Sequence, residues 1–287
     1  MSIDVIILTY NSAEHLPAAV ASVRTQTTRD VTITVIDNAS TDNTLDIARE
    51  LGLTPIANPH NIGFGAAINQ AAAATHADYV ALLNPDAELG DPKALDAMVA
   101  TLSDPQIGIV GTRIQTPAGE PYPNGRRFPS TTLAARHAIM SVLRPGTNSA
   151  SAEYFGPAVG HPDADQTVDW VSGCCLMMKR PLWEQMHGFD PRYWMYLEDA
   201  DLAWRLRENG YTTILSGPAW VTHHGGQSSK FRRNRSLWHH HRSAALFYAR
   251  TRTGWRRILV PAAFAFLGIR LAALVALNTA RRLTASD

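Results

Sequence analysis

Four short apolar runs in the first 112 residues alternate with stretches whose apolar positions repeat at the helical period. The runs are DVIILTY (residues 4–10), VTITVID (31–37), ADYVALLN (77–84) and IGIVGT (107–112). The stretches between and after them predict helices over residues 16–25, 44–51, 66–74 and 92–102. This alternation is typical of βαβ units. It predicts an α/β fold of the Rossmann type, a mainly parallel sheet flanked by helices, with ligands beyond the carboxyl ends of the strands.

The regular pattern stops between residues 112 and 166, which hold seven prolines and five glycines. We expect long loops there around one helix near residues 132–143, forming a lid or an acceptor-side insertion. The pattern resumes with a strand in TVDWVSGCCLMM (residues 167–178). A helix is then predicted from about Asp199 to Asn209, ending at Gly210.

The last segment, residues 258–277, is mostly apolar, is interrupted by Pro261 and Arg270, and has arginines on both sides. Its length fits a membrane-spanning helix. A charge at mid-span is costly, however, which favours a helix in the plane of the membrane interface. A terminal helix packed on the protein is an equal alternative. We expect a catalytic domain over 1–245 and a basic, apolar helical extension over 246–287 at a membrane surface.

The formal net charge of +1 hides a strong asymmetry along the chain. Residues 1–208 contain 14 Lys and Arg against 24 Asp and Glu, whereas residues 209–287 contain 12 against one. The carboxyl-terminal part is therefore expected to face an anionic partner. The only cysteines, Cys174 and Cys175, are adjacent, which excludes a disulfide framework and a CxxC metal site and fits a reducing compartment. Because the first strand follows without a basic leader, we expect a cytoplasmic catalytic part.

Polar residues and glycines follow the predicted strands where a ligand would sit. Asp37 ends the second run and is either a turn residue or an acceptor for a pyrimidine N–H or a ribose hydroxyl. The segment NPHNIGFGAAINQ places Asn61, Gly63 and Gly65 before a helix, where the backbone can approach a ligand closely.

Asn84 and Asp86 flank Pro85 at the end of the third long run. An aspartate after proline is often a turn former. Beside a bound nucleotide, the carboxylate of Asp86 would instead hold Mg²⁺ or Mn²⁺ against a diphosphate, because these ions take oxygen ligands and commonly only one or two from protein.

Two later segments carry further candidates. In YLEDADLAW, Glu198, Asp199 and Asp201 open a helix, where negative charge is favourable in any case. Arg205 is four residues after Asp201 and is its expected partner, which leaves Asp199 as the candidate general base. In WVTHHGGQSS, either His223 or His224 can reach a metal, because side chains alternate along a strand. The alternative is one packed and one exposed histidine.

Together these motifs resemble the family 2 glycosyltransferases with the GT-A fold, in particular rhamnosyltransferase-like members, over about residues 3–245. The segments that carry the resemblance are VIILTYNS, VIDNASTDNT, NPHNIGFGAAINQ, LLNPDAEL, VSGCCLMMKR, GFDPRYWMYLEDADLAWRLRENGY and THHGGQSS.

The resemblance implies a role for each matching residue. Thr9 and Asn11 would line the nucleotide pocket, and Asp37 would bind the base. Asn61 and Gly63 would close over the nucleoside. Asp86 would bind the metal as the last position of the DxD-type motif, in which Asn84 replaces the usual first aspartate. The match also makes His223 a metal or diphosphate ligand and Asp199 the base of an inverting transfer.

The implied reaction takes a nucleotide-diphosphate sugar, with dTDP-rhamnose as first candidate donor and a UDP-hexose as the alternative, and requires Mn²⁺ or Mg²⁺. We further infer an acceptor site with Glu198 beside the base and with Arg232 and Arg233 on the diphosphate of a polyprenyl-linked sugar at the inner face of the membrane.

Three other classes fit less well. A nucleic-acid-binding protein would explain the basic end, but its apolar content and the lack of a nucleic-acid-binding motif argue against it. VIILTYNSAEHL lacks the glycine- and arginine-rich loop of nucleotidyltransferases, and no GxGxxG follows the first strand, as a dinucleotide oxidoreductase requires.

Overall fold

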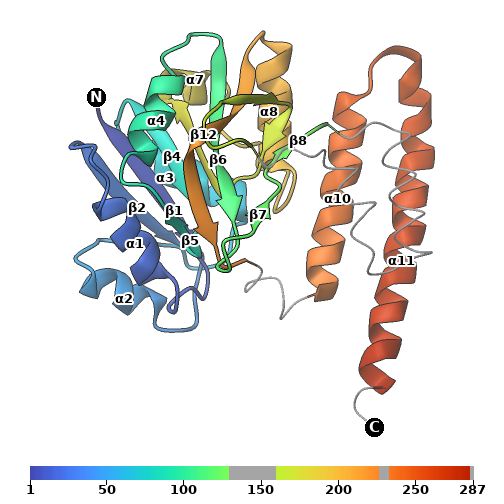
Figure 1. Cartoon of the computed structure of the whole chain (residues 1–287). Helices are drawn as coiled ribbons and strands as arrows, with labels where there is room; N and C mark the ends of the chain where they lie inside the picture. Colours follow the sequence, from blue (N-terminus) through green and yellow to red (C-terminus); the bar gives the residue numbers. More distant parts are fainter. Residues whose placement is uncertain (129–159, 226–232, 285–287) are drawn as a thin grey trace.

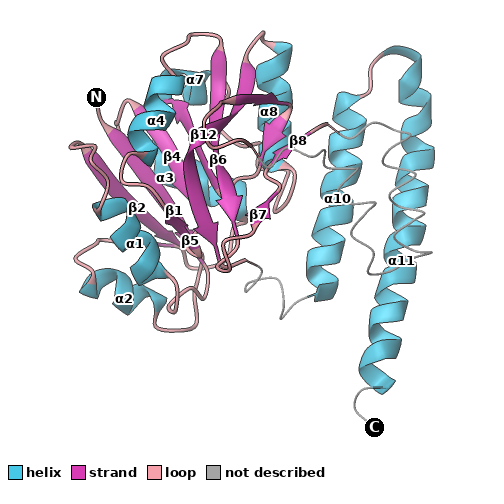
Figure 2. Cartoon of the chain, viewed as in Figure 1, coloured by secondary structure: helices cyan, strands magenta, loops and turns pink. Residues whose placement is uncertain are grey.

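The computed structural model describes residues 1–128, 160–225 and 233–284. The helix predicted near residues 132–143 and the candidate Arg232 lie outside the described residues. The expected α/β architecture is confirmed: helices cover both faces of one large sheet, and a pair of long helices follows at the carboxyl end (Figures 1 and 2).

The large sheet has the strand order β3-β2-β1-β4-β11-β6-β12-β5, with β7 paired to β6 and β9 to β12. Its strands are β1 (Ile3–Thr9), β2 (Val31–Asp37), β3 (Ile56–Ala57), β4 (Tyr79–Leu83), β5 (Ala87–Leu89), β6 (Ile107–Gln115), β7 (Pro121–Tyr122), β9 (Gln166–Val168), β11 (Cys175–Lys179) and β12 (Thr212–His223). On the main path only β11 and β5 run against the others. A second, two-stranded sheet pairs β8 (Gly125–Arg126) with β10 (Trp170–Val171).

The helices form a layer on each face of the sheet. One core joins alternate residues of the strands to α1 (Leu16–Arg24), α2 (Thr44–Glu50) and α4 (Ala94–Thr101). The other core joins the opposite residues to α3 (Phe64–Ala73), α7 (Arg180–Gln185) and α8 (Glu198–Glu208). In β1, for example, Val5 and Ile7 belong to the first core and Ile6 to the second. Strands covered on both faces are apolar throughout, which explains the continuous runs in the sequence.

The single strand predicted over residues 167–178 is wrong. The segment forms β9, β10 and β11, and each pairs with a different strand. Asp169 separates the first two, and its backbone N–H donates to the Arg126 carbonyl at 3.0 Å. Ser172 and Gly173 separate the second from the third, and the Ser172 N–H donates to Asn124 Oδ1 at 3.0 Å. These hydrogen bonds to residues distant in sequence interrupt the predicted strand, and the hydrophobic periodicity of the segment does not reveal them.

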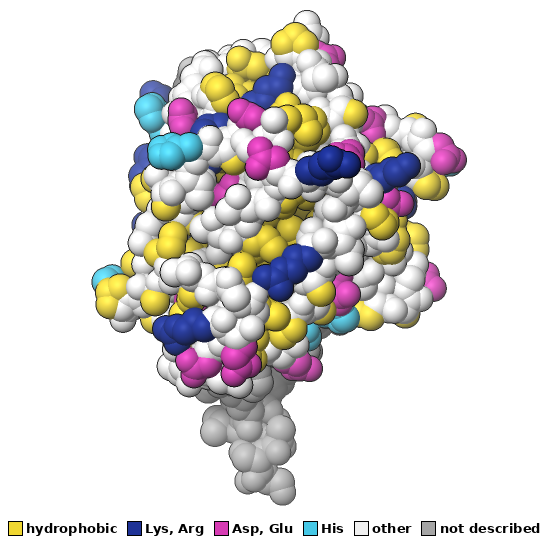
Figure 3. Space-filling model, turned by 90° about the vertical axis from the view of Figure 1, so that its left-hand side faces the viewer, with side chains coloured by type: hydrophobic (Ala, Val, Ile, Leu, Met, Phe, Trp, Pro, Cys, Tyr) yellow, Lys and Arg dark blue, Asp and Glu magenta, His cyan; other side chains and the backbone are white. Residues whose placement is uncertain are grey.

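The carboxyl-terminal helices stand beside the sheet as an antiparallel pair (Figure 1). They are α10 (Arg233–Thr251) and α11 (Val260–Thr284), joined through the 3-10 helix η1 (Gly254–Leu259). Helix α10 continues through residue 245, so the expected boundary between the two parts falls inside a helix. On the opposite side of the molecule acidic and basic side chains are interspersed (Figure 3), in contrast to the uniformly basic carboxyl-terminal sequence.

Candidate active site

The candidate residues gather because the parallel strands end at one edge of the sheet. Thr9 is paired with Asp37 at the ends of β1 and β2, and Leu83 at the end of β4 lies opposite Cys175 at the start of β11. β12 also ends there, at His223. A cavity of about 670 Å³ opens at this edge and is bordered by Asn61, Asn84, Asp86, Glu198 and His223.

Asp37 is fully buried and organises the loops after β1 and β2. Its Oδ1 accepts from Thr9 Oγ1 at 2.8 Å and its Oδ2 from the Ser40 N–H at 2.8 Å. Asn11 joins the same loops, because its side-chain oxygen accepts from the Thr41 N–H at 2.8 Å. Asn11 has a left-handed φ of 52°. Thr9, Asn11 and Asp37 therefore form a scaffold behind the residues that border the cavity.

Asn61 and Gly63 belong to a second network under the cavity. Asn38, which the sequence pattern did not single out, donates from Nδ2 to Asn61 Oδ1 at 3.2 Å and to the Gly63 carbonyl at 3.1 Å. Gly63 has φ 94°, and a Cβ there would lie 2.7 Å from the Trp194 carbonyl oxygen. Only glycine meets both conditions without distortion, so the turn before α3 can pack directly against the loop that contains Trp194.

Asp86 and His223 face each other across the β5–β12 pair. His223 Nε2 lies 3.2 Å from Asp86 Oδ1, and both side chains are largely buried, with 21% and 16% exposed. Burial acts to raise the pKa of Asp86, but the hydrogen bond and charge of His223 outweigh it and leave the pKa below its usual value. His224 also borders the cavity, pairs with Glu88 at 2.7 Å and stacks on His15.

The chemistry of this pair fits a divalent cation such as Mn²⁺, which accepts both carboxylate oxygen and imidazole nitrogen. Within the described residues no group of three or more His, Cys, Asp or Glu is placed to hold a metal. A cation here would therefore take Asp86 and His223 from the protein and the rest of its ligands from a diphosphate and water, as Mg²⁺-type sites commonly do.

Glu198 and Asp199 open α8, and Glu198 and Gly173, which is bonded to Asp199, border the cavity. Asp199 Oδ2 accepts from the Gly173 N–H at 3.0 Å and Oδ1 from the Ala200 N–H at 2.8 Å. Burial raises the pKa of Asp199, and these two N–H bonds and the charge of Arg126 offset the increase only in part. Glu198 is 6% exposed and borders the cavity. Its pKa is raised well above the usual value, mainly by burial and also by the neighbouring charge of Asp199.

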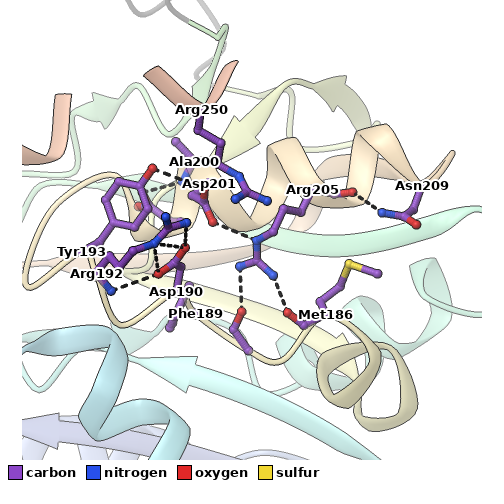
Figure 4. Close-up of polar contacts among 12 residues, drawn as sticks. Met186, Phe189, Asp190, Arg192, Tyr193, Ala200, Asp201, Arg205, Asn209 and Arg250 are labelled. Carbon is purple, nitrogen blue, oxygen red and sulfur yellow. Dashed lines mark hydrogen bonds and ion pairs between the residues drawn. The ribbon is translucent and has the colours of Figure 1, made fainter. Parts of the chain in front are cut away.

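Asp201 is separated from this pair, as its spacing to Arg205 predicted. It is fully buried on the other side of α8, where Oδ2 accepts from Arg205 Nε at 2.8 Å (Figure 4). Arg250 of α10 adds a contact to Oδ1 at 3.0 Å, and the Tyr193 hydroxyl donates to the same oxygen at 3.3 Å. These contacts tie α8 to α10 and give Asp201 a structural role.

Several cavity residues were missed from the sequence. Tyr10 follows β1, Arg126 comes from the irregular stretch after residue 112, and Trp194, Met195 and Tyr196 precede Glu198. The aromatic run PRYWMYLED was a usable signal for the last group. Tyr196 and Leu197 have left-handed φ values of 71° and 65°, and this turn delivers the chain into α8 at the cavity.

Helix α10 supports the same aromatic loop from outside. His239 stacks on Trp194 with ring centroids 4.0 Å apart, and the Ser243 hydroxyl donates to the Met195 carbonyl at 2.9 Å. Arg235 lies over the Trp194 ring at 5.0 Å, and Arg242 donates to the Arg192 carbonyl at 2.6 Å. These contacts place Arg235 and Arg242 beside the loop.

A similar arrangement of sheet and helices occurs in solved glycosyltransferase structures. The mannosyltransferase PcManGT from Pyrobaculum calidifontis, in complex with GDP-Man and Mn²⁺, is similar with a TM-score of 0.59 and 18% identity over 98% of this chain and 80% of that one. S. aureus TarS 1–349 in complex with UDP-GlcNAc gives 0.57 and 16% over 94% and 72%. The fold is that of the GT-A glycosyltransferases.

Sequence comparison identifies the family within this class. A model of glycosyl transferase family 2 matches residues 4–185. The chain is 32% identical over 272 residues to the N-acetylglucosaminyl-diphospho-decaprenol L-rhamnosyltransferase of Mycobacterium tuberculosis, covering 89% of this chain and 86% of the relative. It is 28% identical over 226 residues to the O-antigen chain rhamnosyltransferase RfbN of Salmonella typhimurium, covering 78% and 66%. This chain belongs to glycosyl transferase family 2 and is a glycosyltransferase.

Proposed function

We propose that this glycosyltransferase transfers L-rhamnose from dTDP-rhamnose to a lipid-linked sugar acceptor in cell-envelope glycan synthesis. The observation that carries the proposal is that Asp86, His223 and Glu198 border one cavity at the carboxyl edge of the sheet, and that Asp199 is bonded to Gly173, which also borders it. Asp86 and His223 suit a diphosphate-bound cation, and Glu198 and Asp199 suit an acceptor hydroxyl. The named activities of the rhamnosyltransferase relatives support the choice of sugar and acceptor.

On the donor side, Asn61, Gly63 and the scaffold of Thr9, Asn11 and Asp37 are proposed to hold the nucleoside. The diphosphate is proposed to lie against Asn84, Asp86 and His223. A bound divalent cation supplies positive charge that stabilises the departing nucleoside diphosphate.

On the acceptor side, Asp199 is proposed as the general base. Its two oxygens are fixed by the Gly173 and Ala200 N–H groups, and each keeps a free lone pair for a further hydrogen bond. The acceptor oxygen forms a bond to the anomeric carbon as the bond to the diphosphate oxygen breaks and its electron pair leaves with the diphosphate. The hydroxyl proton passes to Asp199 as charge develops, and the anomeric configuration inverts.

The carboxyl-terminal helices are proposed to hold the enzyme at the cytoplasmic face of a membrane. An 18-residue window within residues 254–276 has a mean hydropathy of 2.3, and none of that window is buried. Ala263, Leu267 and Arg270 lie on the half-buried stripe of α11, and Arg270 reaches His241 of α10 at 2.7 Å. Phe264, Phe266 and Ile269 are exposed by 44%, 41% and 72%. An exposed apolar face between arginine clusters suits a helix at the lipid interface.

The deciding experiment incubates the purified protein and Mn²⁺ with a panel of nucleotide sugars and a GlcNAc-diphosphopolyprenol. Mass spectrometry should show a deoxyhexose added to the acceptor from dTDP-rhamnose, and chelation by EDTA should stop the reaction. Transfer from a UDP-hexose alone would change the assigned sugar, and no transfer or donor hydrolysis from any nucleotide sugar would contradict the proposal.

The acceptor assignment has its own test. Replacing Arg232 and Arg233 by alanine should raise the KM for the lipid-linked acceptor, because guanidinium groups pair with phosphate oxygens, and leave the KM for the nucleotide sugar unchanged. An equal increase for both substrates would argue against it.

A further inference from the structure

The buried carboxyl group of Glu198 has one oxygen without a hydrogen-bond partner among the residues that the structure describes. Its side chain is more than nine-tenths buried, it borders the cavity, and its Oε2 has no hydrogen-bond partner within the described residues. Buried carboxyl oxygens are nearly always satisfied, so an unsatisfied one on a side chain that borders a cavity indicates a missing partner.

The two adjacent carboxyl groups have different surroundings. Asp199 accepts two backbone N–H bonds and lies near the charge of Arg126, which favours its ionised form. In the described part of the chain, Glu198 has only a backbone hydrogen bond within its own residue and stands next to the negative charge of Asp199, so burial and like charge both favour its protonated form. When the environments of two neighbouring carboxyl groups push their pKa values apart, one group acts in the ionised form and the other in the uncharged form.

We propose that Glu198 acts as an uncharged carboxylic acid that donates a hydrogen bond to a sugar hydroxyl oxygen next to the one that Asp199 deprotonates. This inference rests on the proposed function and deepens it. The proton stays on Glu198 throughout, and only the proton of the attacking hydroxyl moves, to Asp199. By holding one hydroxyl of the acceptor sugar, Glu198 selects which neighbouring hydroxyl meets the anomeric carbon.

The test compares Glu198→Gln, which keeps an uncharged donor of the same length, with Glu198→Ala. Acceptor kcat/KM should stay within about threefold for the glutamine variant and fall roughly 10- to 100-fold for alanine, the range expected for losing one buried hydrogen bond to substrate. The KM for the nucleotide sugar should not change in either variant. Glu208→Gln, at the exposed far end of the same helix, is the matched control and should behave as the wild type.

The pH profile separates this role from a structural one. As pH rises through the elevated pKa of Glu198, the wild type should lose acceptor affinity because the donor proton is lost, whereas Glu198→Gln should not. The other charged or titratable groups that border the cavity are Tyr10, Asp86, Tyr122, Arg126, Cys174, Tyr196, His223 and His224, with Asp199 next to Glu198 in the chain, and they are the same in both proteins. Their contributions therefore cancel in the comparison.

An infrared difference spectrum between wild type and Glu198→Gln near neutral pH tests the protonation state without substrate. A carboxylic acid C=O band from the wild type supports the proposal, and a carboxylate band in its place overturns it. A glutamine variant as inactive as Asp199→Asn would also overturn it, because Glu198 would then act through its charge. If the wild type shows the acid band but transfers no sugar, the proposed function fails and the substrate role of Glu198 fails with it.

Discussion

Replacing Asp201 by Asn should weaken the fold while leaving the chemistry intact. Asp201 is fully buried, and its partner Arg205 is only 13% exposed. Arg205 also donates to the Gly188 carbonyl at 2.7 Å and to the Met186 carbonyl (Figure 4). Without the carboxylate, the guanidinium charge would remain buried and uncompensated.

The magnitude follows from these contacts. Removing one partner of a buried ion pair costs about 3–5 kcal/mol. Asparagine keeps one acceptor oxygen and Arg205 keeps two carbonyl partners, so we take the lower end, about 3 kcal/mol. For a domain of this size, that loss lowers Tm by roughly 6–12 °C. Urea denaturation followed by circular dichroism measures the free energy of unfolding directly.

Asp199→Asn is the matched control, two residues away on the same helix. Burial raises the pKa of Asp199, so the folded state disfavours its ionised form, and a neutral asparagine should leave stability unchanged or increased. Its kcat should fall by about 10³-fold, since no group accepts the acceptor proton. Equal unfolding midpoints for the two variants would refute the reasoning. So would an Asp201→Asn protein that remains folded at low temperature but has lost kcat as fully as Asp199→Asn.

Three further outcomes are expected. The pKa of Asp199 is raised and the base acts in its ionised form, so kcat should fall on acidification at a pH above the pKa of an ordinary aspartate. Asp199→Glu should shift this acidic limb of the pH profile. A kcat that is constant down to pH 4 would contradict the role of Asp199. Gly63→Ala should lower the free energy of unfolding by roughly 2 kcal/mol, through backbone strain at φ 94° and the clash with Trp194. Gly119→Ala, with φ 81° but open space around it, measures the backbone strain alone. Equal losses of stability in urea denaturation would exclude a contribution from the Trp194 contact. Replacing the exposed residues Phe264, Phe266 and Ile269 with serine should abolish co-sedimentation with anionic vesicles and spare transfer to a soluble acceptor, and unchanged sedimentation would place the membrane contact elsewhere.

The carboxyl-terminal segment shows how far a local pattern reaches. Hydropathy identified residues 258–277 as exceptional, and the charge at mid-span disfavoured a spanning helix, but in-plane and packed helices fitted the sequence equally well. In the structure one stripe of α11 packs on α10 and the opposite stripe is exposed. Arg270 lies at the packed stripe, where His241 receives it. That contact joins residues 29 positions apart on different helices, so no periodicity within either helix could show it.

The sequence by itself determined the alternation of strands and helices, the strand ends that carry polar residues, and the Asp201–Arg205 pair. These features depend on spacing along the chain, through side-chain periodicity and the i+4 geometry of a helix. Tertiary structure alone decided which residues border the cavity, that Asp37 is a buried scaffold residue, and that Oε2 of Glu198 has no partner among the described residues. Burial and hydrogen bonding there depend on residues such as Gly173 and Arg126, which are 25 and 72 positions from Glu198 along the chain but near it in space. Such proximity exists only after the chain has folded.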